Sequence, residues 1–206
     1  MNNFRLTAGD ILVNINLGND PLSIITRWAV GLYNHVFMYL GKLKFVSCHY
    51  PLVDKVAIWR VGLTEPTPML FESSGRGVVV QSLSNHYGED VVVMRLKPEY
   101  WHSIDNVITE AVRLASDPQA YYDYYCVMKF VLPRIIWEKL HLPLEWMPVT
   151  WHRDRRQICS EAVLEVFLRA GVPILPDDVV PLPGDFVTDS GLLEQVWCGK
   201  LSEEWL

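Results

Sequence analysis

Several features that mark other protein classes are missing from this chain of 206 residues. Its four cysteines are widely scattered without a CxxC pair, so the sequence shows neither a zinc knuckle nor a dense disulfide scaffold. Basic residues are outnumbered, with 18 Lys and Arg against 24 Asp and Glu, which excludes nucleic acid as a partner. No signal-peptide core and no uncharged apolar run long enough to span a bilayer is present. We therefore expect a cytoplasmic protein with reduced thiols.

The chain has ample material for one core, because half of its residues are hydrophobic and 12% are aromatic. No internal repeat or low-complexity segment divides it, so we expect a single domain over residues 1–206. The segment 173–183 is rich in proline and is expected to be an irregular lid or connector.

The hydrophobic pattern changes along the chain from short strands to helices. β-Branched and aromatic runs separated by Gly, Pro, Asn and Asp predict a central sheet, antiparallel because the connections are short. An α+β fold follows, since most strands precede most helices. The expected strands are 9–15, 35–41, 42–48, 57–62, 69–75, 77–83 and 90–96, and the expected helices are 20–34, 98–118, 121–140 with a break at Pro133, and one that follows Cys159.

The last of these helices has clear start and stop residues. Ser160 is the expected N-cap, Gly171 stands where a glycine ends a helix, and Pro173 prevents its continuation. The expected polar stripe is Glu161, Glu165 and Arg169, and the expected buried face is Ala162, Val163, Val166, Phe167 and Ala170.

Cys159 therefore lies at a helix N-terminus, where two interpretations are equally open. The unpaired N–H groups and the positive end of the helix dipole stabilise a thiolate and can hold an oxyanion. Cysteine is also among the most buried residue types and often only packs.

A thiolate nucleophile needs a base and a residue that orients the base. His35 opens an otherwise apolar strand, where an imidazole is costly unless it is hydrogen-bonded. Glu72 ends another apolar strand and can accept the second ring N–H of a histidine, which fixes its tautomer. Taken singly, His35 is more often a core histidine and Glu72 a solvated strand end.

The ordered set of motifs "GDILV", "YNHVFMYLG", "FESSGRGVVVQSL", "VVVMRL", "YYDYY" and "ICSEAVLEVFLRAG" resembles the YiiX-like group of circularly permuted NlpC-type papain-like cysteine hydrolases. Relatives of the lecithin:retinol acyltransferase type share the permuted order, in which the histidine precedes the cysteine. The resemblance covers about residues 8–185 and leaves 186–206 as a C-terminal extension. Such an extension more often docks on its own domain than on a partner.

The resemblance implies a role for each matching residue. Cys159 matches the nucleophile, His35 the base and Glu72 the orienting residue. Tyr122, Tyr124 and Ser160 have a weaker match to substrate or oxyanion contacts. A capping function at the helix start is the alternative for Ser160 and Glu161.

Other residues offer rival chemistry. His152 is near Cys159 in sequence and is the best alternative base. Arg153, Arg155 and Arg156 solubilise their loop, or else lower the cysteine pKa or bind a substrate carboxylate.

Two further combinations are disfavoured. Cys48 and His49 are adjacent on an expected strand, where neighbours point to opposite faces, so they make a poor dyad. A metal site from His35, His49 and Cys159 lacks ligand spacing, and no cofactor is expected.

The leading hypothesis is an amidase or cysteine peptidase that forms a thioester on Cys159. The expected partner is a small peptide, amide or acyl substrate, with peripheral lipid contact left open. A thioesterase or lipid acyltransferase is the alternative, because eight tryptophans and the aromatic segment 121–137 are suited to an acyl pocket. A third hypothesis is a non-catalytic binding module in which Cys159 is only buried.

Overall fold

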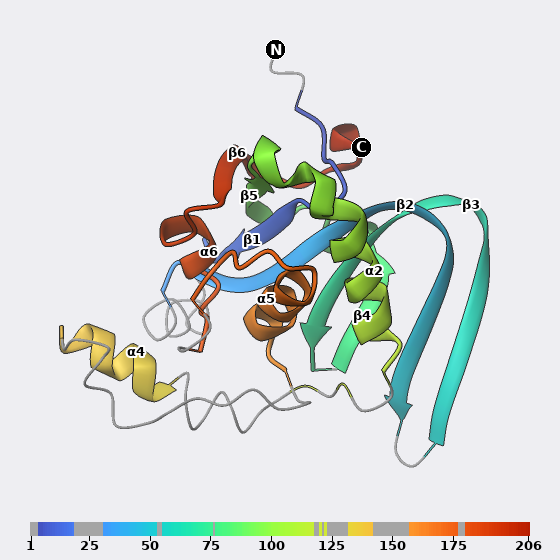
Figure 1. The fold of residues 1–206 in the computed structure, drawn as a ribbon, viewed down its shortest axis with the longest axis horizontal. Helices are drawn as coiled ribbons and strands as arrows, with labels where there is room; N and C mark the ends of the chain where they lie inside the picture. Colours follow the sequence, from blue (N-terminus) through green and yellow to red (C-terminus); the bar gives the residue numbers. More distant parts are fainter. Residues whose placement is uncertain are drawn as a thin grey trace.

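Figure 1 shows the fold as a computed structural model. The structure describes residues 4–18, 31–52, 55–75, 77–117, 120, 122, 132–141, 157–176 and 180–206. For 44–52, 55–64, 132, 133, 135 and 138 it describes the backbone alone. The helix expected over 20–34 lies mostly outside these residues, and its last two positions, Tyr33 and Asn34, belong to a strand instead.

A single six-stranded sheet in the order β4-β3-β2-β1-β5-β6 forms the centre of the molecule. Every neighbouring pair of strands is antiparallel. This confirms the predicted antiparallel sheet and the α+β class. The strands are β1 (Ile11–Ile15), β2 (Tyr33–Leu52), β3 (Lys55–Ser74), β4 (Gly77–Ser82), β5 (Asp90–Leu96) and β6 (Leu193–Lys200).

The segments expected as four short strands form two long ones, β2 and β3, which project from the body as a hairpin arm (Figure 1). The prediction of separate strands was wrong because glycine and polar residues interrupt the pattern without ending the pairing. The register instead shifts between Tyr39 and Gly41 and between Leu43 and Phe45, and Gly41 takes a positive φ of 89°.

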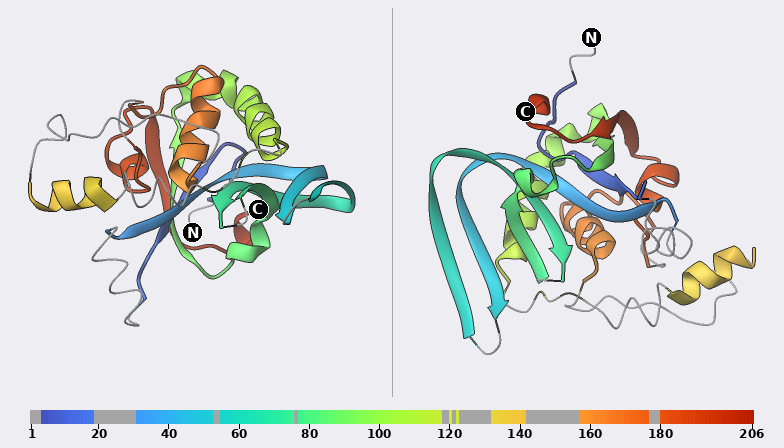
Figure 2. Two further views of the ribbon diagram at one scale, coloured as in Figure 1. Left: turned by 90° about the horizontal axis from the view of Figure 1, so that it is seen from below. Right: turned by 180° about the vertical axis from the view of Figure 1, so that it is seen from behind.

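Helices α2 and α5 cover one face of the sheet (Figures 1 and 2). The helical segments are η1 (Leu83–His86), η2 (Pro98–Ser103), α2 (Ile104–Ala115), α4 (Leu132–Lys139), α5 (Cys159–Arg169), α6 (Asp185–Thr188) and η5 (Glu203–Trp205). The second part of the helical segment expected over 121–140 is α4, with Pro133 in its first turn, where the missing N–H costs nothing. The part before Pro133 lies mostly outside the described residues.

Helix α5 ends as the sequence predicts and begins differently. Gly171 has a φ of +80°, and its N–H and that of Val172 close the last turn onto the carbonyls of Leu168 and Phe167. The expectation that Ser160 is the N-cap was wrong, since the helix already starts at Cys159 with Ile158 before it.

Capping at this end of α5 is done by Glu161. Its Oε2 accepts the N–H of Ile158 at 2.8 Å, so this carboxylate is turned inward and buried and does not belong to an exposed stripe. Glu165 and Arg169 do remain on the outer side, as an ion pair of 2.7 Å.

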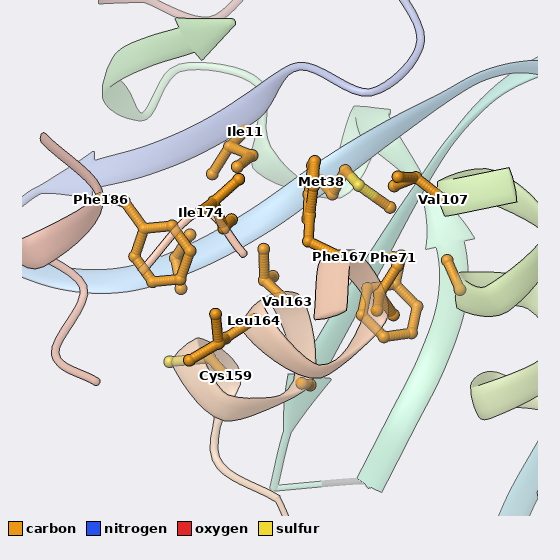
Figure 3. Close-up of a cluster of buried hydrophobic side chains, with 14 of the residues drawn as sticks. Ile11, Met38, Phe71, Val107, Cys159, Val163, Leu164, Phe167, Ile174 and Phe186 are labelled. Atoms are coloured by element: carbon orange, nitrogen blue, oxygen red, sulfur yellow. The ribbon is translucent and has the colours of Figure 1, made fainter. Parts of the chain in front are cut away.

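Two hydrophobic clusters lie on opposite faces of the sheet. Side chains alternate along β2, so Val36, Met38 and Leu40 belong to the larger cluster beneath α2 and α5, shown in Figure 3. Phe37 and Tyr39 belong to the smaller cluster, which the two ends of the chain cover.

The C-terminal segment is part of this architecture. Strand β6 pairs with β5 along its whole length, and the carbonyl of Trp205 accepts the N–H of Leu6 at 2.7 Å. The segment thus packs on the same sheet that carries the N-terminal strand.

Phe167 anchors α5 to the larger cluster, and its side chain is completely buried. We expect Phe167→Ala to lower the free energy of unfolding by about 3–5 kcal/mol, because it removes a large buried ring and leaves a cavity. The matched change Leu140→Ala, at a side chain that is 62% exposed, should cost less than about 0.5 kcal/mol. Denaturant unfolding followed by circular dichroism measures both, and equal losses would contradict this view of the core.

Candidate functional site

The site is located where β2 and β3 stop pairing. Their hydrogen-bonded register runs as far as Met38 opposite Phe71 and does not include the residues that precede Met38 or follow Phe71. The N–H of Tyr39 donates to the carbonyl of Asp10 on the β1 side of β2. Successive N–H groups along a strand point alternately to its two sides, so the N–H of Val36, three residues earlier, points toward β3. The gap between the two strands therefore presents a backbone donor without a strand partner.

The N-terminus of α5 fills this gap. The Sγ of Cys159 accepts hydrogen bonds from the N–H groups of Val36 and Ser160. On the other side, Ser73 Oγ of β3 donates to the carbonyl of Gln157 at 2.6 Å in a buried contact. The helix start is thereby attached to both strands.

Cys159 is 7% exposed and lies at the first residue of α5. Burial opposes ionisation, but the neighbouring His35 and the two N–H groups outweigh it, so the pKa of the Cys159 thiol lies below its ordinary value. These contacts therefore favour the thiolate form of Cys159.

His35 lies near the start of β2, opposite Asn14 of β1. Its Nε2 is 2.7 Å from Glu72 Oε2, which leaves Nδ1 as the ring nitrogen for Cys159. Burial disfavours the imidazolium, yet the Cys159 thiolate and the Glu72 carboxylate together raise the pKa of His35 to about 10. The Cys159 and His35 side chains thus favour an ion pair.

Glu72, near the end of β3, is 3% exposed and accepts several hydrogen bonds. His35 and His86 approach its Oε2, at 2.7 and 3.3 Å, and Gln81 Nε2 donates to its Oε1. Burial alone would raise the pKa of Glu72, but His35 and His86 lower it to about 2. The structure therefore brings together Cys159, His35 and Glu72, as the sequence predicts.

Sequence reasoning missed His86 and Gln81. In the β3–β4 hairpin, Glu72 pairs with Val79, so Gln81, two residues further along β4, lies diagonally opposite Glu72 on the same face. Aligning the two strands of this hairpin in the sequence would therefore have found Gln81. His86 lies in the 3₁₀ segment η1, whose residues follow no hydrophobic period that would reveal a buried side.

The remaining predicted residues have different outcomes. Ser160 is fully buried, and its Oγ donates to the carbonyl of Pro181 at 2.6 Å, so its hydroxyl ties α5 to the proline-rich segment while its N–H faces the sulfur. Tyr122 is half-buried in an irregular stretch. Tyr124, His152 and residues 153–156 lie outside the described residues.

Cys48 and His49 occupy successive positions of β2, in the part of the strand where the backbone alone is described. Within the part of the chain that the structure describes, no group of three or more His, Cys, Asp and Glu side chains is arranged to hold a metal ion. None of the helices described is long and apolar enough to cross a membrane.

A polar hollow of about 310 Å³ lies behind the carboxylate of the site. Glu72, Ser74, Gln81, Asn85 and His86 line it. None of these lining residues belongs to α5, so the hollow adjoins the Glu72 and His86 end of the cluster.

Comparison with solved structures finds a neighbour that shares the fold. The chain superposes on a crystal structure described as the metalloprotein YiiX from Escherichia coli O157:H7, DUF1105, with a TM-score of 0.57 and 17% sequence identity. The alignment covers 95% of this chain and 98% of the YiiX chain. The YiiX-like fold expected from the motifs is thereby supported over nearly the whole chain.

No protein-family model matches the sequence, and no curated protein matches it.

Cys159 and Cys198 offer a direct test of the site, because the first is buried and the second exposed. We expect iodoacetamide near neutral pH to alkylate Cys159 faster than Cys198, and to keep doing so at lower pH, since only a thiolate reacts and the pKa of Cys159 is lowered. Peptide mass spectrometry over time distinguishes these two cysteines and also follows Cys48 and Cys126. Alkylation in order of exposure, with Cys198 first, would show that Cys159 is an ordinary core thiol.

Proposed function

We propose that this protein is a cysteine hydrolase with a permuted papain-like fold, which cleaves an amide bond through a thioester on Cys159. The observation that carries the proposal is the contact of one imidazole with two partners: His35 meets Cys159 on one side and Glu72 at 2.7 Å on the other. A nucleophile, a base and a residue that orients the base is the arrangement that nucleophilic catalysis requires.

The chemistry follows from the charges of the three groups. The Cys159 thiolate attacks the carbonyl carbon of the amide, and the His35 imidazolium gives its proton to the leaving amine. Water then attacks the thioester after losing a proton to His35, and the acid leaves as the thiolate re-forms. Glu72 keeps the imidazole in one tautomer and stabilises its charged form.

The oxyanion of each tetrahedral intermediate needs donors beside the sulfur. The start of α5 supplies the positive end of the helix dipole in the gap between β2 and β3, with the N–H of Ser160 facing the sulfur. The hydroxyl of Ser160 is engaged with Pro181, so its backbone rather than its side chain is suited to this role.

Thioester or lipid-ester chemistry uses the same three residues and remains the second candidate. Its motivation, the aromatic segment 121–137, lies mostly outside the described residues. A binding module of the same fold is distinguished from both enzymes by the reactivity of Cys159, because a module has no need of a thiolate.

Trapping the acyl intermediate tests the function and identifies the bond. The protein is incubated with p-nitrophenyl acetate and with small amide, ester and thioester libraries, and its intact mass is followed. We expect a mass increase of one acyl group on Cys159, absent in Cys159→Ser, with amides yielding turnover. Acylation of other cysteines at equal rates, or none at Cys159, would contradict the proposal.

A second test asks whether the base is His35 or the alternative His152. We expect His35→Ala to abolish turnover of the trapped substrate class and to raise the pKa of Cys159 toward about 8.5, because the ion-pair partner is lost. His152→Ala should leave that pKa unchanged. Thiolate absorbance near ~240 nm, titrated against Cys159→Ser to remove the other cysteines, reports both values. A shift in His152→Ala and none in His35→Ala would overturn the assignment of His35.

Glu72→Gln tests the orienting residue with a side chain of the same shape. We expect the fold to persist and turnover of p-nitrophenyl acetate to fall by about 10²-fold or more, because an amide can present N–H where His35 needs an acceptor. Steady-state rates and thermal unfolding, measured on the same preparation, separate catalysis from stability. Unchanged rates would remove Glu72 from the mechanism.

A further inference from the structure

We propose that His86 is a positioning residue of this site, which acts through Glu72 by holding its carboxylate against His35. The inference rests on the proposed function and adds to it a residue outside the three expected from the sequence. It is drawn from the contacts of His86 on both of its ring nitrogens.

Each ring nitrogen of His86 faces a different carboxylate. Nε2 is 3.3 Å from Glu72 Oε2, and Nδ1 is 3.0 Å from Glu89 Oε2. A neutral imidazole carries one N–H, so it can donate to only one of these oxygens. The imidazolium carries an N–H on each nitrogen, so the two facing carboxylates favour a charged ring.

The position of His86 is fixed from several strands. Its ring stacks on Phe37 of β2, with centroids 4.4 Å apart. Glu89, just before β5, also accepts from Asn14 of β1 at 2.5 Å, so it is itself held in place. A ring restrained in this way can impose an orientation on Glu72.

The division of donors on Glu72 explains what His86 contributes. Gln81 donates to Oε1, whereas His35 and His86 share Oε2 from rings whose centroids are 6.1 Å apart. Without His86, Glu72 keeps the neutral donor Gln81 on Oε1, but its Oε2 loses one of its two cationic partners and retains only His35. The carboxylate would then be less firmly directed at His35.

The charged groups around His86 agree with this role. Among the described residues, those in contact with it are Glu72 from β3, Glu89 from the segment before β5, and the like-charged His35 from β2. Burial opposes its protonation, but the two carboxylates raise the pKa of His86 to about 9. The ring is therefore cationic at neutral pH, and its positive charge also favours the thiolate of Cys159.

The test is the pKa of the Cys159 thiol in His86→Gln, measured from the pH dependence of iodoacetamide alkylation. We expect a rise of about half a pH unit or more, since losing a nearby cation and loosening Glu72 both disfavour the thiolate. His102→Gln is the matched control, because His102 is exposed on η2, and it should leave the pKa unchanged. A packing role alone would lower the melting temperature of His86→Gln without moving this pKa, and that result would overturn the proposal.

A double-mutant cycle tests whether His86 acts through Glu72. In the Glu72→Gln background, His86 loses the carboxylate that it holds and only its charge still acts on the thiol, so adding His86→Gln should raise the Cys159 pKa by clearly less than it does in the wild type. An equal rise in both backgrounds would show that His86 acts independently of Glu72 and would overturn the proposal.

The wild-type protein provides a measurement that needs no substitution. Nitrogen NMR of histidine-labelled protein at pH 7 should show both ring nitrogens of His86 protonated, and a neutral His86 would overturn the proposal. If the Cys159 pKa is low in the wild type and His86→Gln leaves it unchanged, the role of His86 is refuted but the proposed function is not. An ordinary thiol pKa in the wild type refutes the proposed function and this inference with it.

Discussion

The site depends on a break in the pairing of β2 with β3, which leaves the N–H of Val36 without a partner on β3. Where the two strands stop pairing, the N–H of Val36 binds the sulfur of Cys159, and Ser73 holds the carbonyl of Gln157. The N-terminus of α5 thus occupies a place that a regular sheet would close. Buried backbone donors need partners, so the separation of the strands and the position of the thiol stabilise each other.

Charge alternates through the side chains that surround this gap. The Cys159 thiolate, His35, Glu72, His86 and Glu89 form a series in which each group neighbours one of opposite sign. Individually these groups are costly to bury, and their mutual contacts offset that cost. The series explains why Glu72 stays ionised although it is almost completely enclosed.

The sequence predicted those features of the fold and site that depend on short-range patterns or on the quoted motifs. The end of α5 at Gly171 and the antiparallel sheet follow from stop residues and short connections, and the meeting of Cys159 with His35 and Glu72 agrees with the resemblance of the quoted motifs. The start of α5 differs from the expected one, because Ile158 rather than Ser160 precedes the helix and Glu161 caps it. The sequence was not informative about His86, because a 3₁₀ turn has no period from which burial can be inferred. The merging of short strands into β2 and β3 also escaped it, since Gly41 bends the pairing without ending it.

The wide separation along the chain of the groups that meet at α5 has a consequence for biosynthesis. His35 and Glu72 belong to strands near the start of the chain, whereas Cys159 follows most of the remaining sequence. During translation the sheet can form around His35 and Glu72 while the thiol is still to be made. A fragment that ends before Cys159 therefore carries His35 and Glu72 without the thiol that they meet in the folded protein. Long-range contacts of this kind also slow folding, because a long segment of chain must be closed before Cys159 meets His35 and Glu72.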